Sequence, residues 1–201
     1  MKEHCLQTIA SRRSVSALKR DENLKKDELI EVIEQSLYHS PTAFNSQSSK
    51  VLVLLDEDHV AFWEAVKDRL RPLVNGSFDK TEAKINGFSN GNGTVLYFED
   101  QMIQDELKAK IPLYANEVSL WASQSQGILQ YVVWMLLTSM GLSASLQHYN
   151  PLIDEYVYTE LGIERSLSLV AMMPFGLPAE LPSEKFQRPI KDRVLSINKS
   201  K

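Results

Sequence analysis

Residues 40–55, Ser-Pro-Thr-Ala-Phe-Asn-Ser-Gln-Ser-Ser-Lys-Val-Leu-Val-Leu-Leu, join a polar turn to a strongly apolar run. The run from Val51 to Leu55 consists of strand-forming residues without alternation, which is typical of a strand covered on both faces. The Ser-Pro start and the small polar residues after it are typical of a turn between a helix and a strand. We therefore expect the polar segment to lie at the mouth of a core strand.

The rest of the chain alternates between helix and strand patterns. Leu29, Ile33 and Leu37 recur every four residues with Ile30 in the same stripe, which predicts a helix over 27–38 with one buried face. Further helices are expected over 58–70, 100–111, 119–140 and 153–161, and strands over 94–98, 143–147 and 166–173. A long turn-rich excursion, with Asn75-Gly76 and Gly-Phe-Ser-Asn-Gly-Asn-Gly at 87–93, is expected before the second strand.

The segment 119–140 is apolar on most faces and is expected to be a central helix, buried nearly all round. Polar residues from Ser123 to Gln126 interrupt it, so its apolar part is shorter than the roughly 20 residues that a membrane span requires. The sequence predicts no transmembrane helix.

Length and composition exclude several classes of protein. The 201 residues are 43% hydrophobic, enough for one sizeable core, and we expect one domain over 1–201. Lys and Arg total 22 against 26 Asp and Glu, so no broad basic face is expected to bind nucleic acid. The single cysteine, Cys5, can form no internal disulfide, and no signal-peptide pattern opens the chain, which favours a cytoplasmic protein.

Common catalytic motifs are absent from the sequence. Gly91-Asn92-Gly93 precedes a strand, whereas a dinucleotide-binding glycine loop follows one. The segment 141–145, Gly-Leu-Ser-Ala-Ser, lacks the second glycine of a nucleophile elbow. The four histidines lack metal-ligand spacing, so no metal site is predicted.

Two polar segments together look like a flavin site. Residues 11–16, Ser-Arg-Arg-Ser-Val-Ser, offer two guanidinium groups and hydroxyls at a helix end, which suits a terminal phosphate. Residues 40–47 offer amides and backbone donors, which suit the polar edge of a planar heterocycle.

Four features follow one another along the chain: the two polar segments, a helix–Gly-Leu–strand at 141–147, and a basic tail. Their order is the one found in the FMN-dependent nitroreductase family, which the chain resembles over nearly its whole length. Gly-Thr-Val-Leu-Tyr-Phe-Glu-Asp at 93–100 and Ser-Leu-Gln-His-Tyr-Asn-Pro at 145–151 resemble the subgroup of the yeast fatty-acid-repression-mutant protein and its bacterial relatives. The resemblance implies an α+β nitroreductase fold with a mixed central sheet flanked by helices. It also implies an intertwined homodimer with a C-terminal tail, 184–197, across the partner.

The resemblance also assigns site residues. Arg12, Arg13 and Ser14 match the family's phosphate and ribityl contacts, and Ser16 stands where the family often has a lysine near the flavin pyrimidine ring. Lys84 falls where a second family lysine approaches the flavin N1 and C2 carbonyl, although an ordinary exposed lysine is the alternative.

Two further groups follow from the same resemblance. Pro41, Thr42 and Asn45, with Gln47 as a weaker candidate, match a segment that reaches the flavin from the partner subunit; a plain helix-to-strand turn is the alternative. Gln147 and His148 match the positions where the family presents backbone groups to the flavin N5 and O4 edge. Lys185 and Arg188 match the family's C-terminal phosphate-binding cations.

His148 is the one candidate for a proton donor, although a structural histidine is the alternative. Phe44, Tyr114 and Trp121 are candidates for the roof of a substrate pocket, against ordinary core packing.

The function implied is an FMN oxidoreductase that moves two electrons from NADH or NADPH to a nitroaromatic or quinone acceptor in a ping-pong cycle. No side-chain nucleophile is needed, because the cofactor supplies the chemistry. The alternatives are a flavin-binding sensor in stress or lipid signalling, and an interaction protein whose motifs have decayed. Intact Arg12, Arg13 and Asn45 argue against decay.

Overall fold

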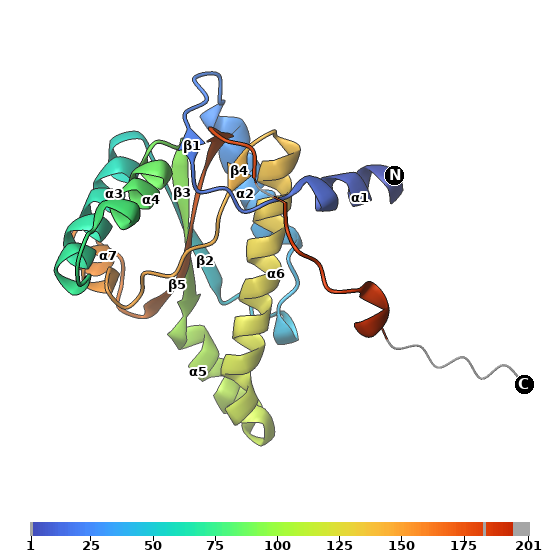
Figure 1. Cartoon of the computed structure of the whole chain (residues 1–201). Helices are drawn as coiled ribbons and strands as arrows, with labels where there is room; N and C mark the ends of the chain where they lie inside the picture. The colour runs from blue at the N-terminus through green and yellow to red at the C-terminus, as the bar shows by residue number, and fades with distance from the viewer. Residues whose placement is uncertain (1, 183, 195–201) are drawn as a thin grey trace, which may run out of the picture.

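The computed structural model describes residues 2–182 and 184–194 (Figure 1). Its helices are α1 (Lys2–Ser11), α2 (Lys26–His39), α3 (Asp56–Leu70), α4 (Asp79–Ser89), α5 (Gln101–Lys110), α6 (Val118–Ser139) and α7 (Asp154–Thr159). The strands are β1 (Leu18–Lys19), β2 (Ser49–Leu55), β3 (Gly93–Asp100), β4 (Ser143–Ala144) and β5 (Leu167–Pro178). Short 3-10 turns are η1 (Ala43–Asn45), η2 (Arg71–Leu73), η3 (Pro112–Glu117) and η4 (Ile190–Asp192).

The strands form one sheet in the order β1-β5-β3-β2, with β4 also paired to β5. All the ladders between these strands are antiparallel. Within the described residues, the parallel pairing expected of a mixed sheet is confined to a single bridge between Ser14 and Ala144. Sequence patterns place strands but do not encode their direction when the connections are longer than hairpins.

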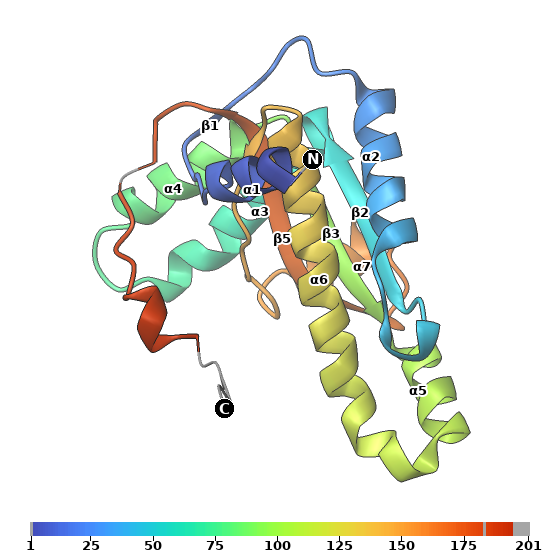
Figure 2. The same ribbon diagram turned by 90° about the vertical axis from the view of Figure 1, so that its right-hand side faces the viewer.

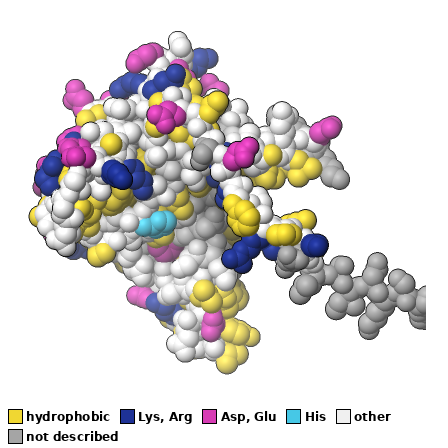
Figure 3. All heavy atoms as spheres, viewed as in Figure 1, with side chains coloured by type: hydrophobic (Ala, Val, Ile, Leu, Met, Phe, Trp, Pro, Cys, Tyr) yellow, Lys and Arg dark blue, Asp and Glu magenta, His cyan; other side chains and the backbone are white. Residues whose placement is uncertain are grey.

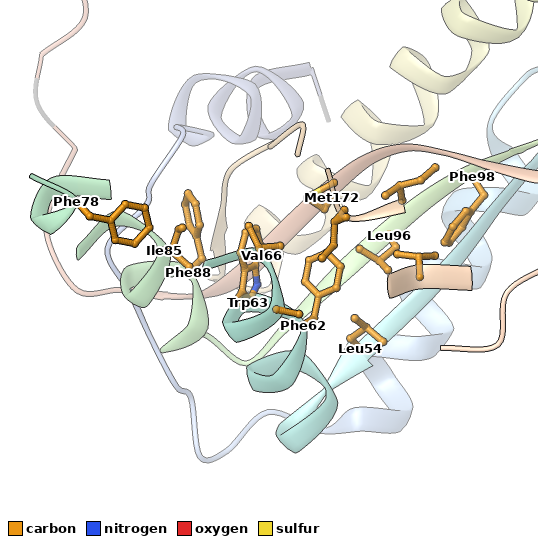
Figure 4. Packing of buried hydrophobic residues seen from close by; sticks show 14 residues of the cluster. Leu54, Phe62, Trp63, Val66, Phe78, Ile85, Phe88, Leu96, Phe98 and Met172 are labelled. Carbon is orange, nitrogen blue, oxygen red and sulfur yellow. The ribbon is translucent and has the colours of Figure 1, made fainter. Parts of the chain in front are cut away.

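Strand β3 is buried along its whole length, and alternate residues face opposite layers of helices. Val95 and Tyr97 pack on the side of α2 and α6, whereas Leu96 and Phe98 pack on the side of α3, α4 and α7. Figure 4 shows the second layer, with Trp63 at its centre. The sheet is therefore covered on both faces, as the apolar runs predicted.

The excursion expected between the first two core strands contains a helix that the sequence pattern did not predict. Helix α4 includes Gly87, although glycine and asparagine indicated a turn there. Ile85 and Phe88 are fully buried in the core, so tertiary packing stabilises a helix that local propensity does not favour.

Helix α6 is the longest element, and the prediction that it is buried nearly all round is wrong for the single chain. One face, with Leu129, Val133 and Leu137, packs on the sheet. A stripe of apolar residues on the other side is open to solvent: Leu120 (53% exposed), Ile128 (43%) and Tyr131 (43%). Within the described part of the chain, no helix combines the length and apolar character needed to cross a membrane.

Both ends of the described chain leave the body of the molecule. Figures 1 and 2 show α1 and the segment after β5 extending past α6, away from the sheet. The segment after β5 exposes Leu181 (91%), Phe186 (84%) and Ile190 (68%). The predicted tail, 184–197, continues this segment, and its residues 195–197 lie outside the described residues.

Candidate functional site

The segment 12–16 is fixed to the sheet edge by its backbone. The amide of Val15 donates to the carbonyl of Ala144 (3.1 Å), and Ser14 forms the parallel bridge to the same residue. The side chains of Ser14 and Ser16 remain exposed. A polar, outward-facing segment is thus held rigidly where β4 meets β5.

Arg12 lies over the indole ring of Trp134, with its guanidinium carbon 4.4 Å from the ring centroid. A guanidinium stacked by its face keeps its N–H edge free to bind a phosphate with two parallel hydrogen bonds. Both Arg12 and Arg13 are half-buried. Trp134 was not predicted as part of the site, because an aromatic residue on an apolar helix gives no sequence signal for this role.

Helix α4 brings Lys84 to the same region. A side chain at Gly87 would place its Cβ 2.6 Å from the carbonyl oxygen of Ser16, so only glycine allows the helix to pack this closely. Residues three apart lie on one side of a helix, which places the exposed Lys84 on the side facing the segment 12–16. Its ammonium is 5.6 Å from the ring centroid of Phe88.

After β4, the backbone of Gln147 is bonded to the sheet. Its amide donates to Met172 (2.8 Å) and its carbonyl accepts from the Met172 amide (3.0 Å). The Gln147 amide is therefore already used, and its carbonyl already accepts one hydrogen bond. The assignment of Gln147 to the flavin edge stays a prediction. His148, the next residue, is exposed.

The segment 41–47 is unusual in its backbone. Phe44, Asn45 and Gln47 have φ of 54°, 51° and 52°, the left-handed region that residues other than glycine rarely adopt. The Thr42 hydroxyl accepts from the Gln47 amide (3.0 Å), and the Ala43 amide donates to the Ser125 hydroxyl of α6 (3.4 Å). Such conformations concentrate at functional sites and indicate more than a plain turn.

Beside this segment is a cavity of about 350 Å³ lined by Leu37, Thr42 and Gln47, among others. Pro41 and Asn45 are exposed nearby. The segment therefore borders a space into which another molecule can enter.

The predicted roof residues form one aromatic cluster. The Trp121 ring centroid is 5.6 Å from that of Phe44 and 5.9 Å from that of Tyr114. Phe44 and Tyr114 are 61% and 48% exposed, so the cluster is not core. Figure 3 shows hydrophobic side chains gathered at this protruding end of the molecule.

The structure does not bring all the predicted residues together within one chain. Arg12 lies over Trp134, near the C-terminal end of α6, whereas the segment 41–47 is bonded to Ser125 of the same helix. Ser125 is nine residues before Trp134, which is about 13 Å along the helix. The candidate site is thus in two parts: the first has Arg12, Arg13, Ser14, Ser16, Lys84 and His148, and the second has Pro41, Thr42, Asn45, Gln47 and the aromatic cluster. Lys185 and Arg188 are exposed on the segment after β5.

Solved structures with this fold define its class, which is that of the nitroreductases. The nitroreductase CinD from Lactococcus lactis matches in its complex with nicotinic acid (TM-score 0.89, 34% identity) and in its complex with 4-nitrophenol (TM-score 0.87, 35% identity). In both cases the match covers 96% of this chain and 99% of CinD. A nitroreductase from Desulfitobacterium hafniense with bound FMN shares the fold at 18% identity, with a TM-score of 0.71 over 98% of this chain and 100% of that chain.

The chain belongs to the nitroreductase family, whose family model matches residues 9–177. Two proteins of Saccharomyces cerevisiae are similar to it. HBN1, which carries the name of a nitroreductase, is 31% identical, and the nitroreductase FRM2 is 26% identical. Each match covers 90% of this chain and 91% of the yeast protein.

Proposed function

We propose that this protein is an FMN-dependent oxidoreductase that moves two electrons from NADH or NADPH to a nitroaromatic or quinone acceptor by a ping-pong mechanism. The observation that carries the proposal is the cationic first part of the site: a stacked arginine and a helix-borne lysine beside a fixed, hydroxyl-rich backbone segment. The cytoplasmic location of the protein and its single domain over 1–201 stay predictions.

The residues fit FMN in both charge and shape. Arg12 and Arg13 would hold the phosphate, and the stack on Trp134 lowers the entropy that Arg12 loses on binding. Ser14 and Ser16 would reach the ribityl hydroxyls. The close contact at Gly87 holds α4 against the segment 12–16, and from this helix Lys84 would act on the ring system.

FMN held by these residues would supply the redox chemistry, which is two-electron transfer from reduced nicotinamide to the acceptor. The positive charge of Lys84 would stabilise negative charge on the bound cofactor. His148, which is exposed, would offer its backbone amide or its ring to the bound cofactor.

We infer that the complete site is formed by two chains. Within one chain the segment 41–47 and the aromatic cluster lie far from Arg12, but the corresponding segment of a second copy can cover it. The exposed stripe on α6 and the apolar residues after β5 are the surfaces that such a homodimer would bury. The same partner segment would deliver Lys185 and Arg188 to the phosphate.

The ligands of CinD support the choice of substrates. CinD binds nicotinic acid, which has the pyridine ring of nicotinamide, and 4-nitrophenol, a nitroaromatic. Both are small and planar, and the exposed rings of Phe44, Tyr114 and Trp121 can stack on such molecules.

Steady-state kinetics test the proposal. With FMN-loaded protein, rates at varied NADH or NADPH and several fixed nitroarene concentrations should give parallel double-reciprocal lines, since the donor leaves before the acceptor binds. Cys5→Ser serves as a matched control and should leave the rates unchanged. If neither nicotinamide reduces flavin-loaded protein, the oxidoreductase proposal is wrong and the sensor hypothesis replaces it.

A further inference from the structure

Asparagine is followed by glycine four times in this chain, and the proposed function uses none of these asparagines. The pairs are Asn75-Gly76, Asn86-Gly87, Asn90-Gly91 and Asn92-Gly93. In such a pair the backbone nitrogen of glycine can reach the side-chain carbonyl carbon of asparagine, since glycine has no Cβ in the way. The attack requires that the asparagine side chain and the glycine amide are both free to rotate, so the fold decides which pair reacts.

Two of the pairs are held by α4. Asn86-Gly87 lies inside the helix, where the hydrogen-bond ladder fixes the dihedral angles of both residues. Asn90 follows the helix as its C-cap. The amide of the next residue, Gly91, donates to the Phe88 carbonyl (3.0 Å). Either pair can therefore react only in molecules whose helix end has opened.

Asn92-Gly93 is held by hydrogen bonds and by burial. Asn92 is 6% exposed, and its side-chain amide makes two hydrogen bonds with the backbone of Asp21. Its Oδ1 accepts from the Asp21 amide and its Nδ2 donates to the Asp21 carbonyl, both at 2.9 Å. Gly93 is the buried first residue of β3. Attack at Asn92 requires that both hydrogen bonds break, so this pair is protected as well.

Asn75-Gly76 is the pair without such restraint. It lies in the connection between η2 and α4, and both residues are exposed. The two backbone amides and the Asn75 side chain form no hydrogen bond with any described residue. Gly76 has a φ of 91°, and no atom lies within 4 Å of the position that its Cβ would take, so this side of the glycine is open.

The surfaces assigned to the proposed homodimer leave this pair exposed. The connection belongs to the layer of α3 and α4, on the face of the sheet opposite α6 (Figure 1). The apolar surfaces of the homodimer are on α6 and on the segment after β5.

We propose that Asn75 is a site of spontaneous deamidation through a succinimide, and that the fold protects the other three asparagines. In the first step the Gly76 amide loses its proton to water or hydroxide, its nitrogen bonds to Cγ of Asn75, and Nδ2 leaves as ammonia. Water then opens the five-membered ring. Cleavage of the bond from the nitrogen to Cγ gives aspartate, and cleavage of the bond from the nitrogen to the main-chain carbonyl carbon gives isoaspartate.

The modification changes both charge and backbone ahead of α4. Either product adds one negative charge to a chain whose formal net charge is -4. Isoaspartate also carries the main chain through the side-chain carbon, which inserts one methylene into the connection. An enzyme that methylates isoaspartyl carboxylates is the class of partner that recognises this product. This proposal does not depend on flavin binding.

Ageing of the full-length folded protein in mildly alkaline buffer, followed by tryptic peptide mass spectrometry, tests the proposal. Trypsin separates the sites, because the peptide 70–80 contains Asn75 and the peptide 85–108 contains the other three asparagines. The peptide 70–80 should gain about 1 Da. It should convert at least about tenfold faster than 85–108, because the other pairs react only after local opening. An unaged sample digested in the same way gives the baseline.

Two further measurements separate the route from the effect of the fold. The aged peptide 70–80 should accept methyl groups from a protein isoaspartyl methyltransferase, because opening of a succinimide gives isoaspartate as well as aspartate. Ageing of protein unfolded in guanidinium chloride should bring the conversion of 85–108 close to that of 70–80, since the fold is what distinguishes the pairs.

Variants then locate the site in the folded protein. Asn75→Gln keeps the amide but needs a six-membered ring, so it should remove the acidic form that isoelectric focusing resolves in aged protein. Asn90→Gln makes the same change at an exposed residue of a protected pair and should leave the acidic form at its wild-type level. Both positions are exposed, so both variants are expected to fold.

Three results would overturn the proposal: a peptide 70–80 that keeps its mass in aged folded protein, equal conversion of the two peptides in folded protein, or conversion of 70–80 without methyl acceptance. The first would show that the connection is held in an unreactive conformation. The second would show that the fold does not select among the pairs, and the third would assign the change to direct hydrolysis of the amide.

Discussion

Arg12 shows how a single contact converts a common surface residue into a binding group. An arginine at a helix end is usually solvated and mobile, but here the guanidinium carbon lies over the Trp134 ring, 4.4 Å from its centroid. The cost of ordering this long side chain is therefore met before a ligand arrives. The Arg-Arg-Ser motif predicted the charge, whereas the platform beneath it depends on a residue 122 positions away and could not be predicted.

Lys84 is expected to act on turnover more than on affinity. Lys84→Ala should slow reduction of the flavin by NADH or NADPH by on the order of tenfold, with a smaller change in FMN affinity, because its charge matters most as negative charge develops. Stopped-flow absorbance measures the first quantity and fluorescence titration the second. Lys80→Ala, one turn earlier on α4 and also exposed, is the control and should match the wild type. Equal losses in rate and affinity would show that Lys84 only binds.

His59 makes the stability of the protein depend on pH. It is buried in the layer of α3, with its Nδ1 2.8 Å from the Thr94 hydroxyl. Burial lowers the pKa of His59 from 6.5 to about 4, opposed in part by hydrogen bonding of the ring N–H to the backbone of Phe88 and Ser89. The unfolded chain therefore binds a proton between these values that the folded chain does not, so stability falls as pH falls through this window.

The expected loss in the free energy of unfolding is on the order of 3 kcal/mol between about pH 6.5 and pH 4. Urea unfolding at a series of pH values measures it. His59→Asn, which keeps a polar partner for Thr94, should be less stable at neutral pH but should lose less on acidification. His39→Gln changes an exposed histidine and should follow the wild type. A wild-type slope that persists in His59→Asn would assign the pH dependence to other groups.

At the scale of elements, the close contact between α4 and the segment 12–16 depends on Gly87. Gly87→Ala should destabilise the protein by about 1–3 kcal/mol, since its Cβ would meet the Ser16 carbonyl at 2.6 Å and the backbone must move. FMN affinity should fall together with stability, because the same movement displaces the segment 12–16, which is proposed to bind the phosphate. Lys80→Ala, at an exposed position of the same helix, is the control. It should be neutral or slightly stabilising, because alanine has the higher helix propensity. Chemical denaturation measures the free energy of unfolding of both variants. Equal values for the two would contradict this role of Gly87.

The elements with strong periodic patterns could be predicted, and those that depend on tertiary contacts could not. The strand at 51–55 and the helix at 27–38 are close to β2 and α2, because a continuous apolar run and a four-residue repeat each encode one geometry. Helix α4 was missed because Ile85 and Phe88 are helical only when the core covers them. Gln147 and Met172 fall in the strands expected over 143–147 and 166–173, but which residues of the two strands would pair could not be read from the sequence.

At the scale of the whole molecule, the segment after β5 is expected to hold two chains together. Its exposed apolar residues, with Phe186 84% exposed, bury nothing within the single chain. A truncation before Glu184 should therefore dissociate the dimer and lose FMN together, because the same segment carries Lys185 and Arg188. Sedimentation velocity and the flavin absorbance of one sample measure both. A truncated chain that stays dimeric and fully loaded with FMN would exclude this role.

The central claim is that each FMN site combines residues 12–16 of one chain with residues 41–47 of the other. Arg12→Ala with Arg13→Ala should weaken FMN binding by about 1.5–3 kcal/mol for each charge-assisted bond lost, and Thr42→Ala with Asn45→Ala should weaken it from the other side. Homodimers of either double variant should therefore retain little flavin.

The most direct measurement is the FMN content of a purified heterodimer that pairs one chain of each double variant, made with two affinity tags. In a shared site, both lesions fall in one site and the other site is intact, so the absorbance spectrum should show one tightly bound FMN per heterodimer. If each chain instead forms its own site, both sites carry a lesion, and a heterodimer as empty as the two parent homodimers would contradict the account.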